Sequence, residues 1–185
     1  MRQTSRMSTI LITGASSGLG AEMARQFAAR GHDLALCARR TDRLDELHSE
    51  IAGEHPDRRV EVRALDVNDD DQVFEVFRAF QADFTTIDRV IINAGLGTGA
   101  PLGTGGYAAN KETAMTNFVA ALAQSEAAME IFRAQNSGHF VMLSSMSAMR
   151  GLPKTMTAYA ATKAGVARAT SPRAYATSCT ASRSR

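Results

Sequence analysis

The sequence predicts a single α/β domain in which helices cover both faces of a parallel sheet, the doubly wound arrangement. Short apolar segments that suit buried strands alternate with segments whose apolar residues recur at helical spacing. A glycine-rich turn over residues 13–20 joins the first strand segment to the first helix. Strands separated by helices pair in parallel through right-handed crossovers, so a ligand is expected beyond the carboxyl ends of the strands.

Five segments have the composition of strands. Residues 10–12, 33–38, 89–93 and 140–143 are mainly apolar runs. Residues 60–65 alternate apolar with charged side chains, which predicts an edge strand rather than a fully buried one.

Helical periodicity occupies the stretches between these segments. The expected apolar faces are, in chain order, Leu19, Met23 and Phe27; Leu44, Leu47 and Ile51; Val73, Phe77 and Phe80; and Met115, Phe118, Leu122, Met129 and Phe132. A further helix is expected around Tyr159. Gly31 suits the end of the first helix, and Asn68 or Asp69 can cap the third. Residues 95–106 are predicted to form a loop.

Composition fits one domain with an ordinary core, because 44% of the 185 residues are hydrophobic and 22% are charged. Cys37 and Cys179 have no paired or metal-like spacing, so we expect a reducing compartment, by default the cytoplasm, and no metal site. The net charge is +2, but residues 167–185 hold four arginines and no acid. The basic balance therefore belongs to the tail, and neither a nucleic-acid surface nor a membrane span is predicted.

The glycine-rich turn, Thr-Gly-Ala-Ser-Ser-Gly-Leu-Gly, has the pattern of a phosphate-binding turn between a strand and a helix. Gly14 would let the backbone reverse sharply, Gly18 would let main-chain N–H groups approach a pyrophosphate, and Gly20 would let the helix lie close to its strand. The helix start adds unpaired N–H donors and a partial positive charge. Alternatively, three small residues at a tight turn serve only packing.

Three motifs in this order resemble the short-chain dehydrogenase/reductase family over residues 7–166. They are Thr-Gly-x-x-x-Gly-x-Gly in 13–20, Asn93-Ala94-Gly95, and Tyr159-x-x-x-Lys163. The resemblance implies a Rossmann-like sheet truncated to about five strands in the order 3-2-1-4-5. It also implies an oxidoreductase that interconverts a small-molecule carbonyl and a secondary alcohol by hydride transfer.

Tyr159 and Lys163 are four residues apart, so on a helix their side chains share a face. A phenol, with an ordinary pKa of about 10, is a poor base near neutral pH. An ammonium at roughly 4 Å can favour the phenolate by about 4 kcal/mol in a medium of effective dielectric 20. By resemblance, Tyr159 is the acid/base, and Lys163 also binds the nicotinamide ribose. The alternative is an ordinary pair of neighbours on a helix surface.

The resemblance also implies a serine that orients the substrate oxygen. Ser145 closes the predicted fifth strand and is our choice, with Ser144 and Ser147 as rivals; ordinary turn chemistry is the alternative for all three. Asn117 matches the family's helical asparagine that holds a water beside the lysine, although an exposed helical asparagine is equally consistent with the sequence.

The residues at the end of the second strand bear on which nicotinamide cofactor is bound. Enzymes that exclude the 2′-phosphate place an acidic residue there, about twenty residues beyond the glycines. This chain has Ala38 followed by Arg39 and Arg40. Guanidinium groups pair with phosphate, so NADP(H) is predicted over NAD(H), with Arg39 as the main partner and Ser16 or Ser17 assisting. A solvated pair of charges at a helix start is the alternative.

Other cofactor contacts follow from the resemblance. The glycine turn contributes Leu19, and the third strand is followed by Asp66 and Val67 on the adenine side, although Asp66 could instead introduce the next helix. Asn93, Ala94 and Gly95 end the fourth strand; Asn93 would stabilise the central strands, and Gly95 would leave space beside the cofactor.

The resemblance stops at residue 166. Residues 1–166 are predicted to form the NADP-binding domain with the catalytic motifs, and residues 167–185 to form a disordered tail, because the tail lacks Val, Ile, Leu, Met and Phe. We hypothesise a frameshifted, truncated chain, since GC-rich codons for this tail can encode an amphipathic helix and strand in a shifted frame. A catalytically impaired nucleotide-binding remnant is therefore the alternative function, and the homo-oligomer typical of the family is left open.

Overall fold

A computed structural model of the chain describes residues 7–150 and 154–169. The chain divides into two compact units. The first, which we call the sheet unit, consists of Met1–Gly95 and Val119–Leu143. The second, which we call the helical unit, consists of Leu96–Phe118 and Ser144–Arg185.

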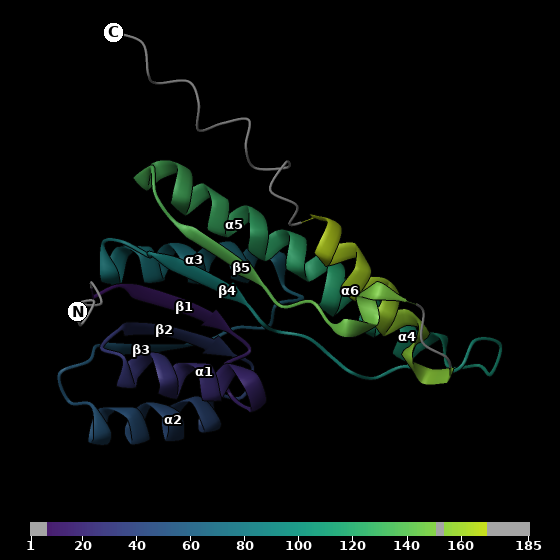
Figure 1. Cartoon of the computed structure of the whole chain (residues 1–185), viewed down its shortest axis with the longest axis horizontal. Coiled ribbons are helices and arrows are strands. Elements are labelled where there is room, and N and C mark those ends of the chain that lie inside the picture. Colours follow the sequence, from purple (N-terminus) through teal and green to yellow (C-terminus); the bar gives the residue numbers. More distant parts are fainter. Residues whose placement is uncertain (1–6, 151–153, 170–185) are drawn as a thin grey trace, which may run out of the picture. The chain divides into compact units, whose positions relative to one another are not determined.

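A parallel sheet forms the centre of the sheet unit (Figure 1). Its described strands are β1 (Thr9–Thr13), β2 (Asp33–Ala38), β3 (Val60–Ala64), β4 (Arg89–Ile92) and β5 (His139–Met142). Their spatial order is β3-β2-β1-β4-β5, and every pair is parallel. This order confirms the predicted doubly wound sheet and the predicted edge position of β3.

Helices cover both faces of this sheet, with α1 (Gly18–Ala29) and α2 (Thr41–Glu54) on one face and α3 (Asp70–Phe84) and α5 (Ala120–Gln135) on the other (Figure 1). The central strand β1 is fully buried because it is covered from both sides. Its Ile12 lies in register with Leu36 of β2 and Ile91 of β4. The segments that follow these three strands therefore emerge at one edge of the sheet, where a ligand was expected.

The long helix predicted before β5 is interrupted, and its expected apolar face is partly wrong. It consists of α4 (Tyr107–Ala114), a π-helical turn η1 (Met115–Val119) and α5. Met115 and Leu122 are 43% and 42% exposed, whereas small residues such as Ala127 and Ala128 are buried. The π turn inserts an extra residue, which breaks the 3.6-residue periodicity across the element. Alanines instead let the α5 backbone lie close to α3 and β4.

Two other helix details refine the predictions. Leu19 is 69% exposed, so the core face of α1 is formed by small residues, Ala21, Ala24 and Ala28, rather than by Leu19. At the third helix the structure selects Asp69 over Asn68, because the Asp69 carboxylate accepts a hydrogen bond from the Gln72 N–H at 3.0 Å.

The helical unit contains the loop over residues 96–106, α4, two 3₁₀ turns, η2 (Met146–Met149) and η3 (Lys154–Met156), and α6 (Thr157–Ala169). Helix α6 packs against α4 and η2. The predicted disorder of the tail and Cys179 concern residues that lie outside the described part of the chain, apart from 167–169. Cys37 is a free, buried thiol. Among the residues described, no helix is both long and apolar enough to cross a bilayer.

Candidate functional site

The turn after β1 has the backbone geometry of a close approach to a ligand. Gly14 and Gly18 have φ angles of 67° and 55°, a region that favours glycine. The space in front of Gly18 is open, since nothing lies within 4 Å of where its Cβ would be. Gly20 is enclosed instead, because a Cβ there would lie 2.4 Å from the Gly14 carbonyl oxygen and 2.6 Å from Nδ2 of Asn93. The first two positions thus shape the turn, and the third allows α1 to approach it.

Asn93 holds this turn against the end of β4. Its Nδ2 donates to the carbonyl oxygens of Thr13 and Gly14 at 3.0 and 3.1 Å. In return, the N–H groups of Asn93 and Ala94 donate to the Thr13 hydroxyl at 3.2 and 3.3 Å. A Cβ on Gly14 would lie 2.8 Å from the Ala94 Cα, so the two chain segments are in van der Waals contact here.

At the amino end of α1, no capping side chain or acidic residue takes the place that a bound anion would occupy. Its N-cap, Ser17, makes no side-chain capping bond, and its first turn contains no acidic residue. The first N–H groups of a helix have no acceptor within the helix and carry a partial positive charge. This end of α1 therefore fits a phosphate group, as a dinucleotide-binding turn requires.

Arg40, rather than Arg39, lies over the turn. Its Nη2 donates to the Ser17 hydroxyl at 2.6 Å, and Nε and Nη2 donate to the Ser16 hydroxyl at 3.3 and 3.2 Å. Arg39 is exposed and has no side-chain hydrogen bond or ion pair with the other described residues. The structure thus brings Ser16, Ser17 and Arg40 together and leaves Arg39, the expected main partner, pointing to solvent.

The segment after β3 is ordered by local hydrogen bonds. The Asp66 carboxylate accepts from the Asn68 N–H at 3.1 Å, and the Asp66 N–H donates to Oε1 of Gln72 at 2.6 Å. Val67 is buried. Asp66 therefore forms the turn that leads into α3, which is the alternative role that the sequence allowed, and this geometry leaves its adenine contact a prediction.

Tyr159 and Lys163 occupy one face of α6 in the helical unit. The Lys163 ammonium lies 5.8 Å from the centre of the Tyr159 ring. Lys163 is only 7% exposed, and burial lowers its pKa below the ordinary value, because a low-dielectric surrounding disfavours the charged form. Tyr159 is half-buried. The pair is therefore not the exposed surface pair that the sequence left possible.

The three candidate serines have different hydrogen bonds. Ser144 donates to the Lys163 carbonyl oxygen at 2.8 Å, which uses its proton. Ser147 is buried, and its hydroxyl has no hydrogen-bond partner among the described residues. Ser145 is half-buried and accepts from the Ser147 N–H at 3.2 Å. Of the three hydroxyls, that of Ser145 is the half-buried one that keeps its own proton for another acceptor.

Asn117 lies in the π-helical turn and is 2% exposed. Its side chain forms two hydrogen bonds with the backbone of Leu96, accepting from N–H at 2.6 Å and donating to the carbonyl at 2.8 Å. Its Nδ2 also lies 3.5 Å from the Thr162 hydroxyl on α6. Asn117 is thus no exposed helical residue, and it connects the loop to the helix that carries Tyr159.

Two further residues that the sequence analysis missed hold the same loop. Asn110 exchanges hydrogen bonds with the Ala100 backbone at 2.9 and 3.0 Å, and the Thr113 hydroxyl donates to the Thr98 carbonyl. Residues 110, 113 and 117 face one side of α4 and η1 and bind residues 100, 98 and 96 in turn. We call Asn110, Thr113 and Asn117 the polar ladder. The signal in the sequence was polar residues at i, i+3 and i+7 beside a glycine-rich loop.

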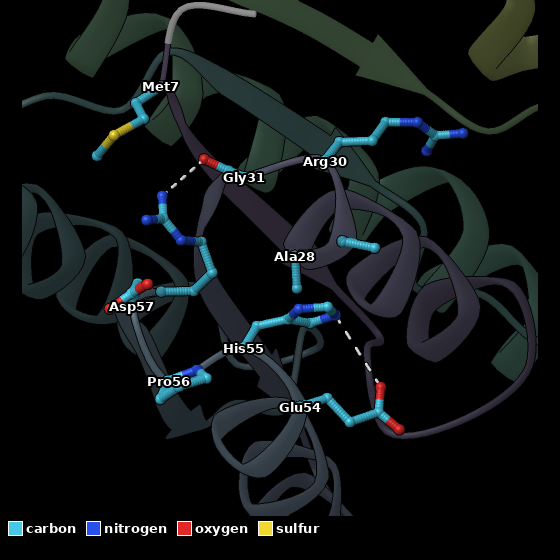
Figure 2. Close-up of a pocket in the computed structure, with 10 residues that line it drawn as sticks. Met7, Ala28, Arg30, Gly31, Glu54, His55, Pro56 and Asp57 are labelled. Atoms are coloured by element: carbon cyan, nitrogen blue, oxygen red, sulfur yellow. Dashed lines mark hydrogen bonds and ion pairs between the residues drawn. The ribbon is translucent and has the colours of Figure 1, made fainter.

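Figure 2 shows a pocket of about 400 Å³ elsewhere in the sheet unit, at the carboxyl ends of α1 and α2. Its polar groups are engaged with one another: Arg58 donates to the Gly31 carbonyl at 2.9 Å, and His55 lies 4.0 Å from Glu54. Because it adjoins the starts of β2 and β3, it is separate from the glycine turn. Within the described part of the chain, no His, Cys, Asp and Glu side chains group as a metal site.

Comparison with known proteins places this geometry in context. A family model described as short chain dehydrogenase matches residues 8–177, which is further than the resemblance from motifs alone. An uncharacterized oxidoreductase of Mycobacterium tuberculosis (strain CDC 1551 / Oshkosh) is 57% identical over 157 residues, covering 85% of this chain and 62% of the relative. The chain thus spans less than two thirds of that relative's length.

Solved structures show the same arrangement of strands and helices. Levodione reductase matches with a TM-score of 0.85 and 30% identity, covering 92% of this chain and 67% of that chain. An alcohol dehydrogenase from the archaeon Thermococcus sibiricus, complexed with 5-hydroxy-NADP, matches with a TM-score of 0.80 and 29% identity, covering 86% and 67%.

Proposed function

Because the chain belongs to the short chain dehydrogenase family of oxidoreductases, we propose that it uses NADP(H) to interconvert a carbonyl group and a secondary alcohol. The observation that carries this proposal is the pair on α6, in which the buried Lys163 ammonium lies beside the ring of Tyr159. A buried cation acts on a neighbouring group with little screening from water. The pair therefore suits a tyrosine that must exchange a proton near neutral pH.

In the proposed reduction, Tyr159 donates the proton to the carbonyl oxygen, and in the oxidation it accepts that proton. Lys163 stabilises the phenolate and binds the nicotinamide ribose. Ser145 donates its free hydroxyl proton to the same substrate oxygen, which orients the carbonyl. Asn117 fixes the loop and holds the water expected from the family resemblance. A bound nicotinamide would supply or accept the hydride.

The sheet unit supports the cofactor part of the proposal. The amino end of α1 and the open space at Gly18 fit a diphosphate, and the residues at the end of β2 and directly after it, 38–40, include no acid that would repel a 2′-phosphate. We assign the 2′-phosphate to both arginines, with Arg40 held in place by Ser16 and Ser17 and Arg39 free to turn towards the ligand. The NADP-type ligand of the Thermococcus sibiricus neighbour is consistent with this preference.

Binding titrations test the cofactor assignment. We expect the chain to bind NADPH more tightly than NADH. Arg39→Ala and Arg40→Ala should each weaken NADPH binding about 10-fold to 100-fold, since a hydrogen bond to a charged group contributes about 1.5–3 kcal/mol. NADH binding should change little. Arg43→Ala, at an exposed arginine in the first turn of α2, the helix that follows Arg40, is the matched control. A parent chain that prefers NADH would overturn the assignment.

The alternative function is nucleotide binding without catalysis. Turnover separates the two. The oxidoreductase should oxidise NADPH with a ketone or aldehyde, and Tyr159→Phe should abolish turnover while NADPH binding remains. Binding of NADPH with no turnover by the parent chain supports the remnant instead. The cytoplasmic location remains a prediction from the cysteine content.

A further inference from the structure

Two methionines beside the proposed catalytic serine are almost fully exposed. Met146 directly follows Ser145 and is 85% exposed, and Met149 ends the same 3₁₀ turn and is 83% exposed. This turn packs against α6, the helix that carries Tyr159. Burial of a large apolar side chain is favourable, so two exposed methionines at this place offer an apolar surface that a bound ligand can cover.

The loop of the helical unit has the same neutral, apolar character. No charged residue occurs between Leu96 and Tyr107. Within this segment Leu102 is 71% exposed, and Tyr107 at its end is 75% exposed. The loop lies close to the segment before α6, because a Cβ on Gly99 would be 2.3 Å from the Thr155 carbonyl oxygen. The polar ladder fixes it there through the backbone of residues 96–100.

The charged groups of this unit have other places or other roles. Lys163 is buried beneath the proposed acid/base. Lys111 and Glu112 lie on the exposed surface of α4. Arg150 follows Met149 in the chain and is exposed.

We propose that the site takes neutral, apolar carbonyl compounds of varied shape, such as aryl and alkyl ketones, which bind against Met146 and Met149. This inference rests on the proposed oxidoreductase function and names its substrate class. Methionine side chains are unbranched, flexible and polarizable, so they adapt to ligands of different outline. The site should therefore select by charge and apolarity more than by exact shape.

Two substrates with the same reacting carbonyl test the charge preference. Acetophenone and 4-acetylbenzoate differ by one carboxylate, far from the ketone. With NADPH and the full chain, we expect kcat/KM for acetophenone to exceed that for 4-acetylbenzoate at least 30-fold. Met149→Lys should narrow this ratio about 10-fold, whereas Met115→Lys, at an exposed methionine of η1, should leave it unchanged. Equal turnover of the two ketones, or faster turnover of 4-acetylbenzoate, would overturn the proposal and leave the oxidoreductase function standing.

A binding measurement keeps the proposal testable if the chain proves catalytically silent. The methyl groups of methionine can be labelled with ¹³C, and Met146→Leu and Met149→Leu assign the two signals. Acetophenone should shift both signals in the NADPH-loaded chain, and 4-acetylbenzoate should not. Shifts without NADPH oxidation would support the binding surface while refuting the enzyme. Unmoved signals with acetophenone would reject the surface, even if turnover occurs.

Discussion

Lys163 is the residue on which the proposed chemistry depends most. It is 7% exposed, lies in the same helix as Tyr159, and is buried in a surrounding that lowers its pKa. A buried ammonium is costly to maintain, because desolvation opposes its charge. Such a group is retained more readily where its charge acts on a neighbour, and here that neighbour is the Tyr159 ring.

Lys163→Met should separate the catalytic role of this residue from a structural one. We expect kcat/KM for carbonyl reduction to fall about 100-fold or more, the scale of a lost proton-transfer catalyst. In the oxidation direction, the pH at which the rate rises should move upward, because loss of the positive charge disfavours the phenolate. Steady-state kinetics between pH 6 and about 10 measure both effects. Lys111→Met, at an exposed position, should change neither, and an unshifted profile in Lys163→Met would exclude the proposed role.

The same substitution has a stability consequence with a defined sign. The pKa of Lys163 in the folded chain lies below its ordinary value of 10.5, so the folded state binds this proton less tightly than the unfolded state. The charge therefore costs stability at neutral pH, and the cost disappears as the pH rises through the folded pKa towards 10.5. In urea unfolding, the stability of Lys163→Met relative to the parent should be highest near pH 7 and should decline as the pH rises towards 10.5. A growing advantage would contradict the assigned burial.

The serine and arginine roles show how far single residues could be predicted. Its place at the end of the predicted fifth strand favoured Ser145, and its hydrogen bonds agree with that choice, since Ser144 uses its proton on the Lys163 carbonyl oxygen. Spacing also indicated two arginines after β2. Spacing does not show that the Arg40 side chain lies over Ser16 and Ser17. The direction of that side chain depends on its hydrogen bonds with the turn after β1, which is distant in the sequence.

At the scale of elements, the polar ladder fixes the loop that follows β4. Three side chains of α4 and η1 bind the backbone of residues 96–100. This stretch is rich in glycine and forms neither helix nor strand. Buried backbone groups need partners, and side-chain bonds replace the missing secondary structure here. The ladder thus positions a loop that continues directly from Asn93-Ala94-Gly95.

Thr113→Val tests the middle of the ladder with almost no change of shape. The Thr98 carbonyl would lose its side-chain donor, and for this partly buried hydrogen bond we expect a loss of about 0.5–1.5 kcal/mol of unfolding free energy. Urea unfolding measures the loss. Thr41→Val makes the same chemical change at an exposed position that has no side-chain bond to the other described residues, and it should alter stability by less than about 0.5 kcal/mol. Equal effects of the two variants would show that the ladder contributes nothing.

The positions of the strands and of the first three helices could be predicted from the hydrophobic pattern. Each strand is a short apolar or alternating segment, and each of these helices covers one face of the sheet and keeps one helical period of apolar residues along its length. The α4–α5 region could not, because the π turn shifts the period and the buried face of α5 includes alanines and two polar residues, Gln124 and Ser125, which carry a weak apolar signal. The sequence left Asn68 and Asp69 as the two candidates for the cap of α3, and the hydrogen bond from the Gln72 N–H identifies Asp69.

At the scale of the whole molecule, the strand order determines where a ligand can bind. The strand order changes at β1, which has β2 on one side and β4 on the other, so the turn after β1 and residues 93–95 after β4 emerge at one edge, and Asn93 bonds to the turn there. This placement followed from the alternation of strands and helices in the sequence. The division into a sheet unit and a helical unit could not be predicted, because both units contain segments far apart in the chain.

Every cofactor assignment above depends on a dinucleotide bound over the glycine turn of the sheet unit. Titration of the ¹⁵N-labelled chain with NADPH, followed by amide chemical shifts, reports on that binding residue by residue. We expect the largest shifts at residues 14–20 and 38–40, and none around His55 in the pocket of Figure 2. Shifts confined to the His55 pocket, or no shifts at saturating NADPH, would contradict it.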